Sequence, residues 1–383
     1  MIFVNQSIGN LTNDILEDFI ENKESIIVFT GRNIGTQLKS DNIEYFYGAE
    51  YNRKNNFTRL VSWIYFTIQA FFFVFKNRNK EKEIFLVSNP PLIFFLILFF
   101  RKNIFYILVY DLYPEILKIK IKKDYFGIIK TWSFLNKIVF KKTALIFTIG
   151  DNMKMSISNY VSIEKIQVVN NWSQLVTKSI CLKSEEFDKI YSYLSNKFIF
   201  IYSGNMGATH DFECVKALML DLNDNAEVVF LFVGGGSKYK ELQLFAAKNR
   251  LINAIFLPKL PPDEFDYILH KSSLGIVTLE KEMENYSIPS KTLSYLGHGL
   301  PLINFSSNYS EITSLVNKFH IGINFDINDY NTRLQILKNL MSNEQNLSIL
   351  KLNAYQISEE HFSPKNARSY LFNIKNYRNN IGL

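Results

Sequence analysis

The sequence lacks the features that stabilise small secreted proteins and many metalloproteins. Its 383 residues include only two cysteines, Cys181 and Cys214, so we expect neither a disulfide framework nor a zinc site. The first ten residues, MIFVNQSIGN, have the pattern of a strand and a turn instead of that of a secretory signal. These absences predict a cytoplasmic protein.

Long apolar runs are also missing. The two most apolar stretches, 60–75 and 92–100, span 16 and nine residues, whereas a transmembrane helix needs about 20. The first contains Gln69 and has basic residues on both sides. It is expected to be either a helix buried against a sheet or a helix lying at a membrane interface. Because its aromatic rings cover more than one face, part of it should be exposed.

The composition is that of a globular chain with an uneven charge. Hydrophobic residues make up 47% and charged residues 21%, and the length predicts two domains. The net charge is +7, but residues 50–150 hold 17 Lys/Arg and 6 Asp/Glu, a net of +11, so the remainder is −4. A basic and apolar half indicates an anionic membrane surface as partner. Nucleic acid would also suit a basic surface, but no recognition motif for it occurs.

Short apolar runs alternate with segments of helical spacing in both halves of the chain. The predicted strands are 2–5, 25–30, 83–88, 104–110, 144–148 and 166–169, then 197–202, 228–233, 255–257 and 273–278. Strands that alternate with helices form parallel sheets. The sequence therefore predicts an α/β protein with two Rossmann-like domains, without further internal repeats or low-complexity tracts.

The segment 286–304, YSIPSKTLSYLGHGLPLIN, combines a loop, a short helix and a buried strand. Pro289 precedes the helix, which opens with Ser290, Lys291 and Thr292. A helix start has unpaired N–H groups and a partial positive charge, so this one could seat a phosphate. An ordinary capped helix would contain the same residues, and both interpretations stay open.

A second glycine-containing loop joins a strand to a helix in the same half. It contains Gly204, Asn205 and Gly207, and a helix is expected from about His210. Such a loop can cradle a phosphate.

Two segments of the first half follow predicted strands. Gly9 and Asn10 lie in the turn after the first strand, where a tight turn without a ligand is the alternative to a ligand contact. Asp111 and Glu115 follow the strand 104–110. The carboxyl ends of parallel strands are where α/β folds bind ligands. The alternative is structural, with Asp111 as a turn residue and Glu115 as a charge at a helix start.

Four motifs carry a resemblance to a known family: PSKTLSYLGHGLPLI at 289–303, DLYPE at 111–115, NNWS at 170–173 and VGGG at 233–236. In this order they resemble retaining glycosyltransferases of family 4, which have the GT-B fold, and especially bacterial members that build surface polysaccharide. The resemblance implies two Rossmann-like domains facing across a cleft, at 1–169 and 170–364. It also implies a C-terminal helix at 365–383 that returns to the first domain.

The resemblance implies roles for individual residues. Asp111 and Glu115 would be catalytic, and Gly9 and Asn10 would lie on the acceptor side. The turn after strand 255–257 would read the nucleobase. The implied donor-binding residues are Gly204, Asn205, Gly207, His210, Lys259, Leu260, Glu284, Pro289, Ser290, Lys291, Thr292 and Ser294.

The chain departs from the family pattern at four of these places. Asn205 and His210 stand where the family usually has Arg and Lys, and Tyr286 and Ser294 stand where it has two glutamates. Glu284 is included because it is close to the first glutamate position. These departures put the exact nucleotide contacts in question.

The implied activity is transfer of a sugar, with retention, from a nucleotide-diphosphate donor such as a UDP-sugar. The acceptor would be a polyprenyl-linked glycan or an oligosaccharide of capsule, O-antigen or exopolysaccharide, at the inner face of the cytoplasmic membrane. There is no Asp-x-Asp triplet, and the five histidines do not cluster with carboxylates, so neither a metal nor a cofactor is expected and Lys291 would neutralise the diphosphate. A GT-B sugar-nucleotide epimerase and a non-catalytic GT-B subunit are the alternatives.

Overall fold

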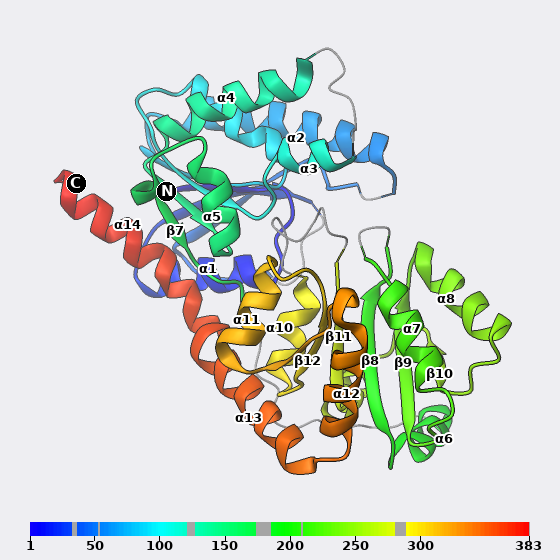
Figure 1. The fold of residues 1–383 in the computed structure, drawn as a ribbon. Coiled ribbons are helices and arrows are strands. Elements are labelled where there is room, and N and C mark those ends of the chain that lie inside the picture. The colour runs from blue at the N-terminus through cyan, green and yellow to red at the C-terminus, as the bar shows by residue number, and fades with distance from the viewer. Residues whose placement is uncertain are drawn as a thin grey trace. The chain divides into compact units, whose positions relative to one another are not determined.

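The computed structural model describes residues 1–32, 37–52, 54–120, 127–173, 185–207, 210–279 and 289–382. The chain divides into two compact units, drawn in Figure 1. The first comprises Met1–Asn171 with Pro364–Leu383, and the second comprises Trp172–Ser363. Each unit has its own parallel sheet and its own apolar core.

In the described part of the first unit, seven strands form a sheet of order β3-β2-β1-β4-β5-β6-β7. Neighbouring strands are parallel throughout. Helices cover both faces of such a sheet, which is why its central strands are continuous apolar runs. The strands are β1 (Ile2–Asn5), β2 (Ile26–Gly31), β3 (Ile43–Gly48), β4 (Glu83–Val87), β5 (Ile104–Val109), β6 (Leu145–Thr148) and β7 (Ile166–Val168).

The helices of the first unit connect these strands. They are α1 (Asn10–Glu21), α2 (Asn56–Asn77), α3 (Glu115–Lys120), α4 (Ile128–Lys142), α5 (Asp151–Ser158) and α14 (Arg368–Ile381), with the short 3₁₀ helices η1 (Pro91–Leu98), η3 (Ile163–Lys165) and η6 (Pro364–Ala367). The apolar segment 92–100 lies mostly in η1, and five of the eight residues of η1 are buried.

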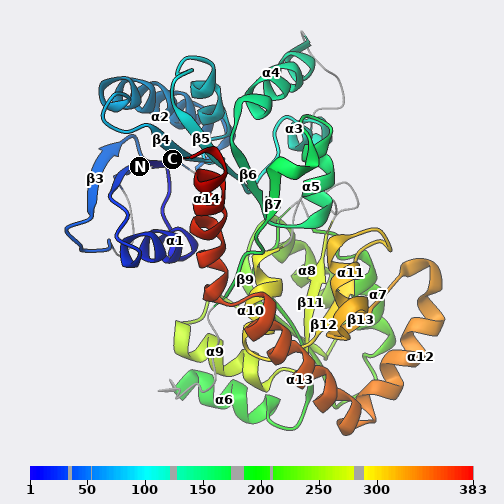
Figure 2. The same ribbon diagram turned by 90° about the vertical axis from the view of Figure 1, so that its left-hand side faces the viewer.

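The C-terminal helix α14 is fixed to the first sheet, as Figure 2 shows. The ring of Tyr370 lies 4.9 Å from that of Phe147, and Arg378 pairs with Glu24 at 2.6 Å and with Glu83 at 2.7 Å. Burial raises the pKa of the Glu83 carboxyl, but the hydrogen bonds from Arg378 and Tyr106, together with the charges of Arg378 and the N-terminus, hold that pKa below its ordinary value. The end of the chain is therefore part of the first unit.

Helix α2 has two apolar faces. On one face Phe66, Ala70 and Val74 are buried in the core of the first unit, where the Phe66 ring lies 5.2 Å from that of Phe29. The other face is exposed, and its large apolar side chains are Phe57, Leu60, Val61, Ile64, Tyr65, Ile68, Phe72 and Phe75. Within the described ranges, α2 is the one helix with the length and composition to cross a membrane. The helix predicted at 60–75 is confirmed, with one face buried and one exposed.

In the second unit, the described residues form a six-stranded parallel sheet of order β10-β9-β8-β11-β12-β13. Its strands are β8 (Phe198–Asn205), β9 (Val228–Gly235), β10 (Ala254–Leu257), β11 (Leu274–Thr278), β12 (Leu302–Phe305) and β13 (Gly322–Asn324). Its helices are α6 (Glu185–Leu194), α7 (Glu213–Asp221), α8 (Ser237–Lys248), α9 (Pro262–Lys271), α10 (Ser290–Gly297), α11 (Glu311–Phe319), η5 (Ile327–Asp329), α12 (Tyr330–Met341) and α13 (Glu344–His361). The predicted class, two Rossmann-like parallel α/β sheets, is confirmed.

Candidate functional site

The carboxyl edge of the second sheet brings together the ends of β8, β9 and β11 and the start of α10. Gly204 is the register partner of Gly234. A Cβ atom on Gly234, whose φ is +132°, would lie 2.3 Å from the Gly204 carbonyl oxygen, so only glycine permits this close approach. Met206 then donates its N–H to the Gly235 oxygen at 2.7 Å, which ties the two loops together.

Lys291 lies in the first turn of α10 and reaches into this edge. Its Nζ atom is 3.3 Å from the centroid of the Tyr202 ring, a cation–π contact. The same atom is shielded from solvent and has no hydrogen-bond partner in the described parts of the chain. Burial lowers the pKa of Lys291 to about 6. An ammonium group in this position lacks the hydrogen bonds that a buried charge requires.

His210 lies beside Lys291 at the end of the glycine-containing loop. Its Nδ1 atom is 2.8 Å from the Thr278 carbonyl oxygen; because a carbonyl oxygen only accepts, Nδ1 carries the hydrogen and Nε2 is the acceptor of the neutral ring. Burial, reinforced by the charge of Lys291, lowers the pKa of His210 to about 4. At neutral pH the imidazole is therefore uncharged in the unliganded protein.

Lys238 is a further cation at this edge that the sequence analysis did not identify. It lies in the first turn of α8, and its Nζ atom donates to the His210 carbonyl oxygen at 2.5 Å, while its N–H donates to the Met206 oxygen at 2.9 Å. The sequence contains a sign of it, since Lys238 is the second helical residue after the glycine run 234–236. A basic residue placed there follows a strand and opens a helix, as Lys291 does.

The other residues of the α10 segment occupy distinct environments. Pro289 precedes the helix without a side-chain cap, and Ser290 is exposed. The Thr292 hydroxyl is buried and has no hydrogen-bond partner among the described residues. Ser294 is partly buried, and its carbonyl oxygen is 2.7 Å from His298 Nδ1. The structure thus brings Lys291, and not the whole Ser-Lys-Thr triplet, onto the Tyr202 ring.

The remaining residues predicted to bind the donor lie at a strand end, in loops or outside the described residues. Asn205 is exposed and Gly207 is partly exposed at the loop after β8. Lys259 is exposed and Leu260 partly buried in the loop after β10. Glu284, like Tyr286, lies outside the described residues.

In the first unit, the two predicted carboxylates have different surroundings. Asp111 is exposed just after β5, whereas Glu115 is buried in the first turn of α3. Glu115 Oε1 accepts a hydrogen bond from the Tyr160 hydroxyl and lies 3.2 Å from Lys118 Nζ. Of the two, Asp111 is the one that solvent reaches.

Gly9 and Asn10 form the start of α1 and are both exposed. A Cβ atom on Gly9 would meet nothing within 4 Å, so a larger residue would fit at this position without a steric clash. Across the ranges that the structure describes, no group of three or more His, Cys, Asp or Glu could hold a metal ion.

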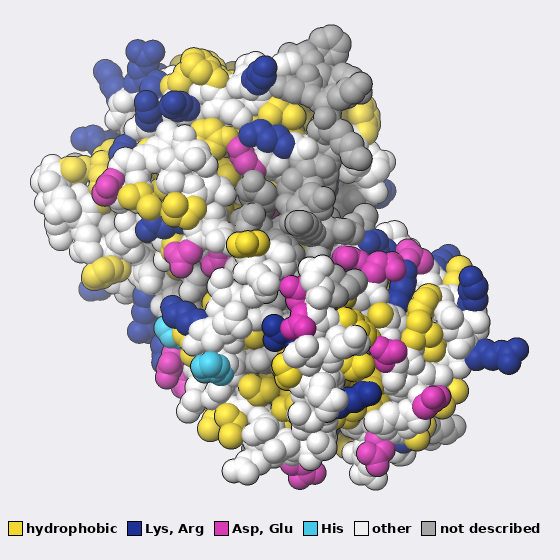
Figure 3. All heavy atoms as spheres, in the orientation of Figure 1, with side chains coloured by type: hydrophobic (Ala, Val, Ile, Leu, Met, Phe, Trp, Pro, Cys, Tyr) yellow, Lys and Arg dark blue, Asp and Glu magenta, His cyan; other side chains and the backbone are white. Residues whose placement is uncertain are grey.

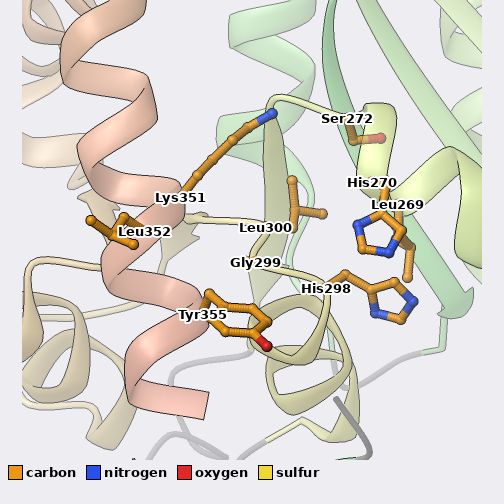
Figure 4. Close-up of a pocket in the computed structure, with 9 residues that line it drawn as sticks. All are labelled: Leu269, His270, Ser272, His298, Gly299, Leu300, Lys351, Leu352 and Tyr355. Atoms are coloured by element: carbon orange, nitrogen blue, oxygen red, sulfur yellow. The ribbon is translucent and has the colours of Figure 1, made fainter. Parts of the chain in front are cut away.

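A cavity of about 510 Å³ lies at the opposite, amino edge of the second sheet, shown in Figure 4. It is lined by the last turn of α9 with His270, the end of α10 with His298 and Gly299, and Lys351 and Tyr355 of α13. Burial lowers the pKa of Lys351. Helix carboxyl ends carry a partial negative charge, so this cavity is a poorer place for a phosphate than the start of α10.

The arrangement of two Rossmann-like parallel sheets with a C-terminal helix on the first is the GT-B fold. The solved structure of WaaG, described as a glycosyltransferase involved in lipopolysaccharide biosynthesis, aligns with a TM-score of 0.65 at 10% identity over 96% of this chain and 98% of that one. HepE of Anabaena, solved in complex with UDP, aligns with a TM-score of 0.67 at 10% identity over 98% of this chain and 99% of that one.

Two curated proteins are similar in sequence. The chain is 24% identical to WbjE of Pseudomonas aeruginosa, named as a probable glycosyltransferase, over 68% of this chain and 67% of that protein. It is 25% identical to WcaI of Escherichia coli strain K12, named as a candidate glycosyl transferase of colanic acid biosynthesis, over 44% of this chain and 41% of that protein. No protein-family model matches the chain. The chain is thus similar to bacterial glycosyltransferases and has their GT-B fold.

The buried ammonium group of Lys291 predicts that a neutral side chain there stabilises the unliganded protein. We expect Lys291→Met to increase the free energy of unfolding by about 1–3 kcal/mol, the usual cost of a buried polar group without a partner. The pKa of Lys291 is about 6 in the folded protein, whereas that of a lysine in an unfolded chain is about 10.5. The unfolded chain therefore binds the extra proton between these values, and wild-type stability rises with pH across that window.

The gain from Lys291→Met should accordingly be largest near pH 6 and vanish towards pH 10.5, as measured by thermal unfolding across this range. Lys216→Met is the matched control, because Lys216 pairs with Glu213 at 2.8 Å and Glu241 at 2.6 Å and should not gain stability. A variant at Lys291 that melts at or below the wild-type temperature at pH 6 would contradict the assignment.

Proposed function

We propose that this protein transfers a sugar from a nucleotide-diphosphate donor to a polyprenyl-linked or oligosaccharide acceptor in bacterial surface-polysaccharide biosynthesis. The observation that carries the proposal is the buried side-chain amine of Lys291 at the start of α10, which has no hydrogen-bond partner among the described residues and becomes a cation when it takes up a proton. A diphosphate bound there would receive both this charge and the N–H groups of the helix start. The sequence relatives and the UDP complex of HepE support the same class of donor.

The chemistry that suits this site is metal-independent transfer with retention. The bond between the anomeric carbon and the donor phosphate breaks, and a bond to the acceptor oxygen forms on the same face. The acceptor proton passes to the departing diphosphate, so no protein nucleophile is required. Lys291 and Lys238 would stabilise the negative charge that develops on the diphosphate, and Asp111 would orient the acceptor hydroxyl.

Incubation with a panel of sugar nucleotides and a lipid-linked acceptor tests the proposal. Labelled sugar should move to the acceptor from one donor, with release of the nucleoside diphosphate, and a UDP-sugar is the expected donor. Asp111→Asn should reduce turnover at least tenfold while the melting temperature stays within a degree or two. Conversion of the free donor to its epimer, or no reaction with any donor, would overturn the proposal.

Nucleotide affinity should depend on the charge of Lys291. With a pKa of about 6, the free lysine is mostly neutral at pH 8, and a bound diphosphate raises its pKa. Binding therefore takes up a proton, and the affinity for UDP should fall by up to about tenfold per pH unit above pH 6. Lys291→Arg stays charged at all these pH values and should flatten the dependence.

Titration calorimetry in buffers of different ionisation heat measures both the affinity and the proton uptake. Lys216→Arg provides the matched control, since it makes the same exchange outside the candidate site. Parallel pH profiles for the wild type and Lys291→Arg would refute a role for Lys291 on the diphosphate.

We also propose that the first unit binds the inner face of the cytoplasmic membrane through the exposed face of α2. This face runs from Phe57 to Phe75, about 27 Å at 1.5 Å per residue, and it contains no acidic residue. Lys54 and Lys76, near the two ends of α2, are exposed, and Figure 3 shows Lys and Arg side chains with apolar ones between them on the first unit. Because the opposite face of α2 is buried, the helix would lie in the interface without crossing the bilayer.

Vesicle flotation tests this membrane contact. Wild-type protein should float with anionic liposomes at low salt and less so at 0.15 M salt, where the screening length is about 8 Å. Ile68→Ser combined with Phe72→Ser should release it, because both side chains are exposed and outside the core. Leu244→Ser, at a 71% exposed position of α8, should have no effect. Wild-type protein that stays in the soluble fraction with anionic vesicles at low salt would refute the contact.

A further inference from the structure

Four aromatic rings form a continuous row in the first unit, at the carboxyl edge of its sheet. Tyr51 follows β3, Trp63 is on α2, Tyr113 follows β5 and Trp132 is on α4. Their centroids are 6.4 Å apart from Tyr51 to Trp63, 5.8 Å from Trp63 to Tyr113 and 5.7 Å from Tyr113 to Trp132. We call these four residues the aromatic cluster. It joins α2 to α4 through the loop that carries Asp111.

The aromatic cluster differs from the ordinary core by its contact with solvent and charge. Tyr51, Tyr113 and Trp132 are partly exposed, and Asp111, two residues before Tyr113, is exposed. The Arg59 guanidinium lies 5.4 Å from the centroid of the Trp63 ring. Burial, and next the charge of Asp111, raises the pKa of Tyr113 to about 12. A cation and a carboxylate thus border the same set of rings.

One polar atom of the cluster lacks a partner. Trp63 is 9% exposed, and its indole Nε1 is buried without a hydrogen-bond partner in the part of the chain that the structure describes. Buried indole N–H groups normally donate to an acceptor, and leaving one unpaired costs free energy. This donor indicates a place for an oxygen atom of a ligand.

We propose that the aromatic cluster binds the glycosyl-diphosphate head of a lipid-linked acceptor. Tyr113 and Trp132 stack on each other with planes that differ by 20°, and the sugar ring would lie on the part of this stacked pair that is exposed to solvent. Trp63 Nε1 would donate to an oxygen of the same ligand, and Arg59 would bind its phosphate. The inference rests on the proposed function and specifies its acceptor.

The surroundings of the cluster favour a lipid-linked head over a free sugar. Arg59 and Trp63 lie on α2, whose exposed apolar face begins at Phe57 in the same turns. Trp132 is flanked on α4 by Ile128 and Phe134, which are 55% and 62% exposed. A prenyl chain that entered the bilayer along these side chains would bring its diphosphate to Arg59.

Intrinsic fluorescence reports on the cluster directly, because two of the three tryptophans belong to it. Trp172→Phe removes the third, which is in the second unit. Titrating this variant with a short-chain, water-soluble prenyl diphosphate that carries one sugar should change the emission in a saturable way. The same prenyl diphosphate without the sugar should bind at least tenfold more weakly, and free sugar weaker still.

Kinetics with the same probe provide the second measurement. Trp132→Ala should raise the acceptor KM at least tenfold, while the donor KM and the slow hydrolysis of donor by water stay unchanged. Leu244→Ala is the control, because it also removes a large exposed apolar side chain but lies on α8 of the second unit, and it should leave the KM for the soluble probe unchanged. Transfer to the probe with wild-type KM in Trp132→Ala, or with no change in fluorescence, would overturn this inference and leave the proposed function standing. Failure of donor binding and of all transfer would instead contradict the proposed function.

Discussion

The close approach of the ends of β8 and β9 is the constraint on which the candidate donor site depends. Because a side chain at position 234 would come within 2.3 Å of the Gly204 oxygen, any other residue would push the strand ends apart. Tyr202, two residues earlier on β8, would move with them. The Tyr202 ring is the surface on which Lys291 lies, and the Tyr295 hydroxyl of the same helix bonds to β8 at Ser203. Strand, loop and helix start are therefore positioned as one piece.

The charged groups of the candidate donor site favour binding of an anionic ligand more than they stabilise the unliganded protein. His210 is neutral at physiological pH because burial and the nearby Lys291 disfavour a second positive charge. Asn205 brings no charge either, so among the residues described at this edge positive charge comes from Lys238 and from Lys291 when it is protonated. Burial disfavours the charged form of Lys291 in the free protein, and an incoming diphosphate would stabilise that charge. Local sequence rules are broken most often at functional sites, and Lys291 fits this pattern.

The sequence predicts those parts of the structure that depend on short-range patterns. The alternation of apolar runs with helical segments predicts both sheets except for the edge strand β3, whose residues are mostly not buried and so form no apolar run. The Ser-Lys-Thr helix start and the glycine loop of β8 are recognisable locally. Burial cannot be read from local sequence: Asp111 and Glu115 are four residues apart and alike in chemistry, yet the segment between β5 and α3 leaves Asp111 exposed and brings Glu115 against Tyr160. The rings of Trp63, Tyr113 and Trp132 come from three distant segments, so no spacing rule could have joined them.

Helix α2 connects membrane contact with acceptor binding through its own geometry. Its inner face is fixed in the core, so the direction of its outer face is fixed relative to the first sheet. Arg59 lies in the first turns of this helix, over the Trp63 ring. Asp111 lies near Tyr113, whose ring contacts that of Trp63. Charged groups remain at the level of water and lipid head groups because moving them into hydrocarbon is costly. The charges of Arg59 and Asp111 therefore limit how deeply the start of α2 can enter the bilayer. They would hold the aromatic cluster at the level of the lipid head groups, where the diphosphate of a lipid-linked sugar lies.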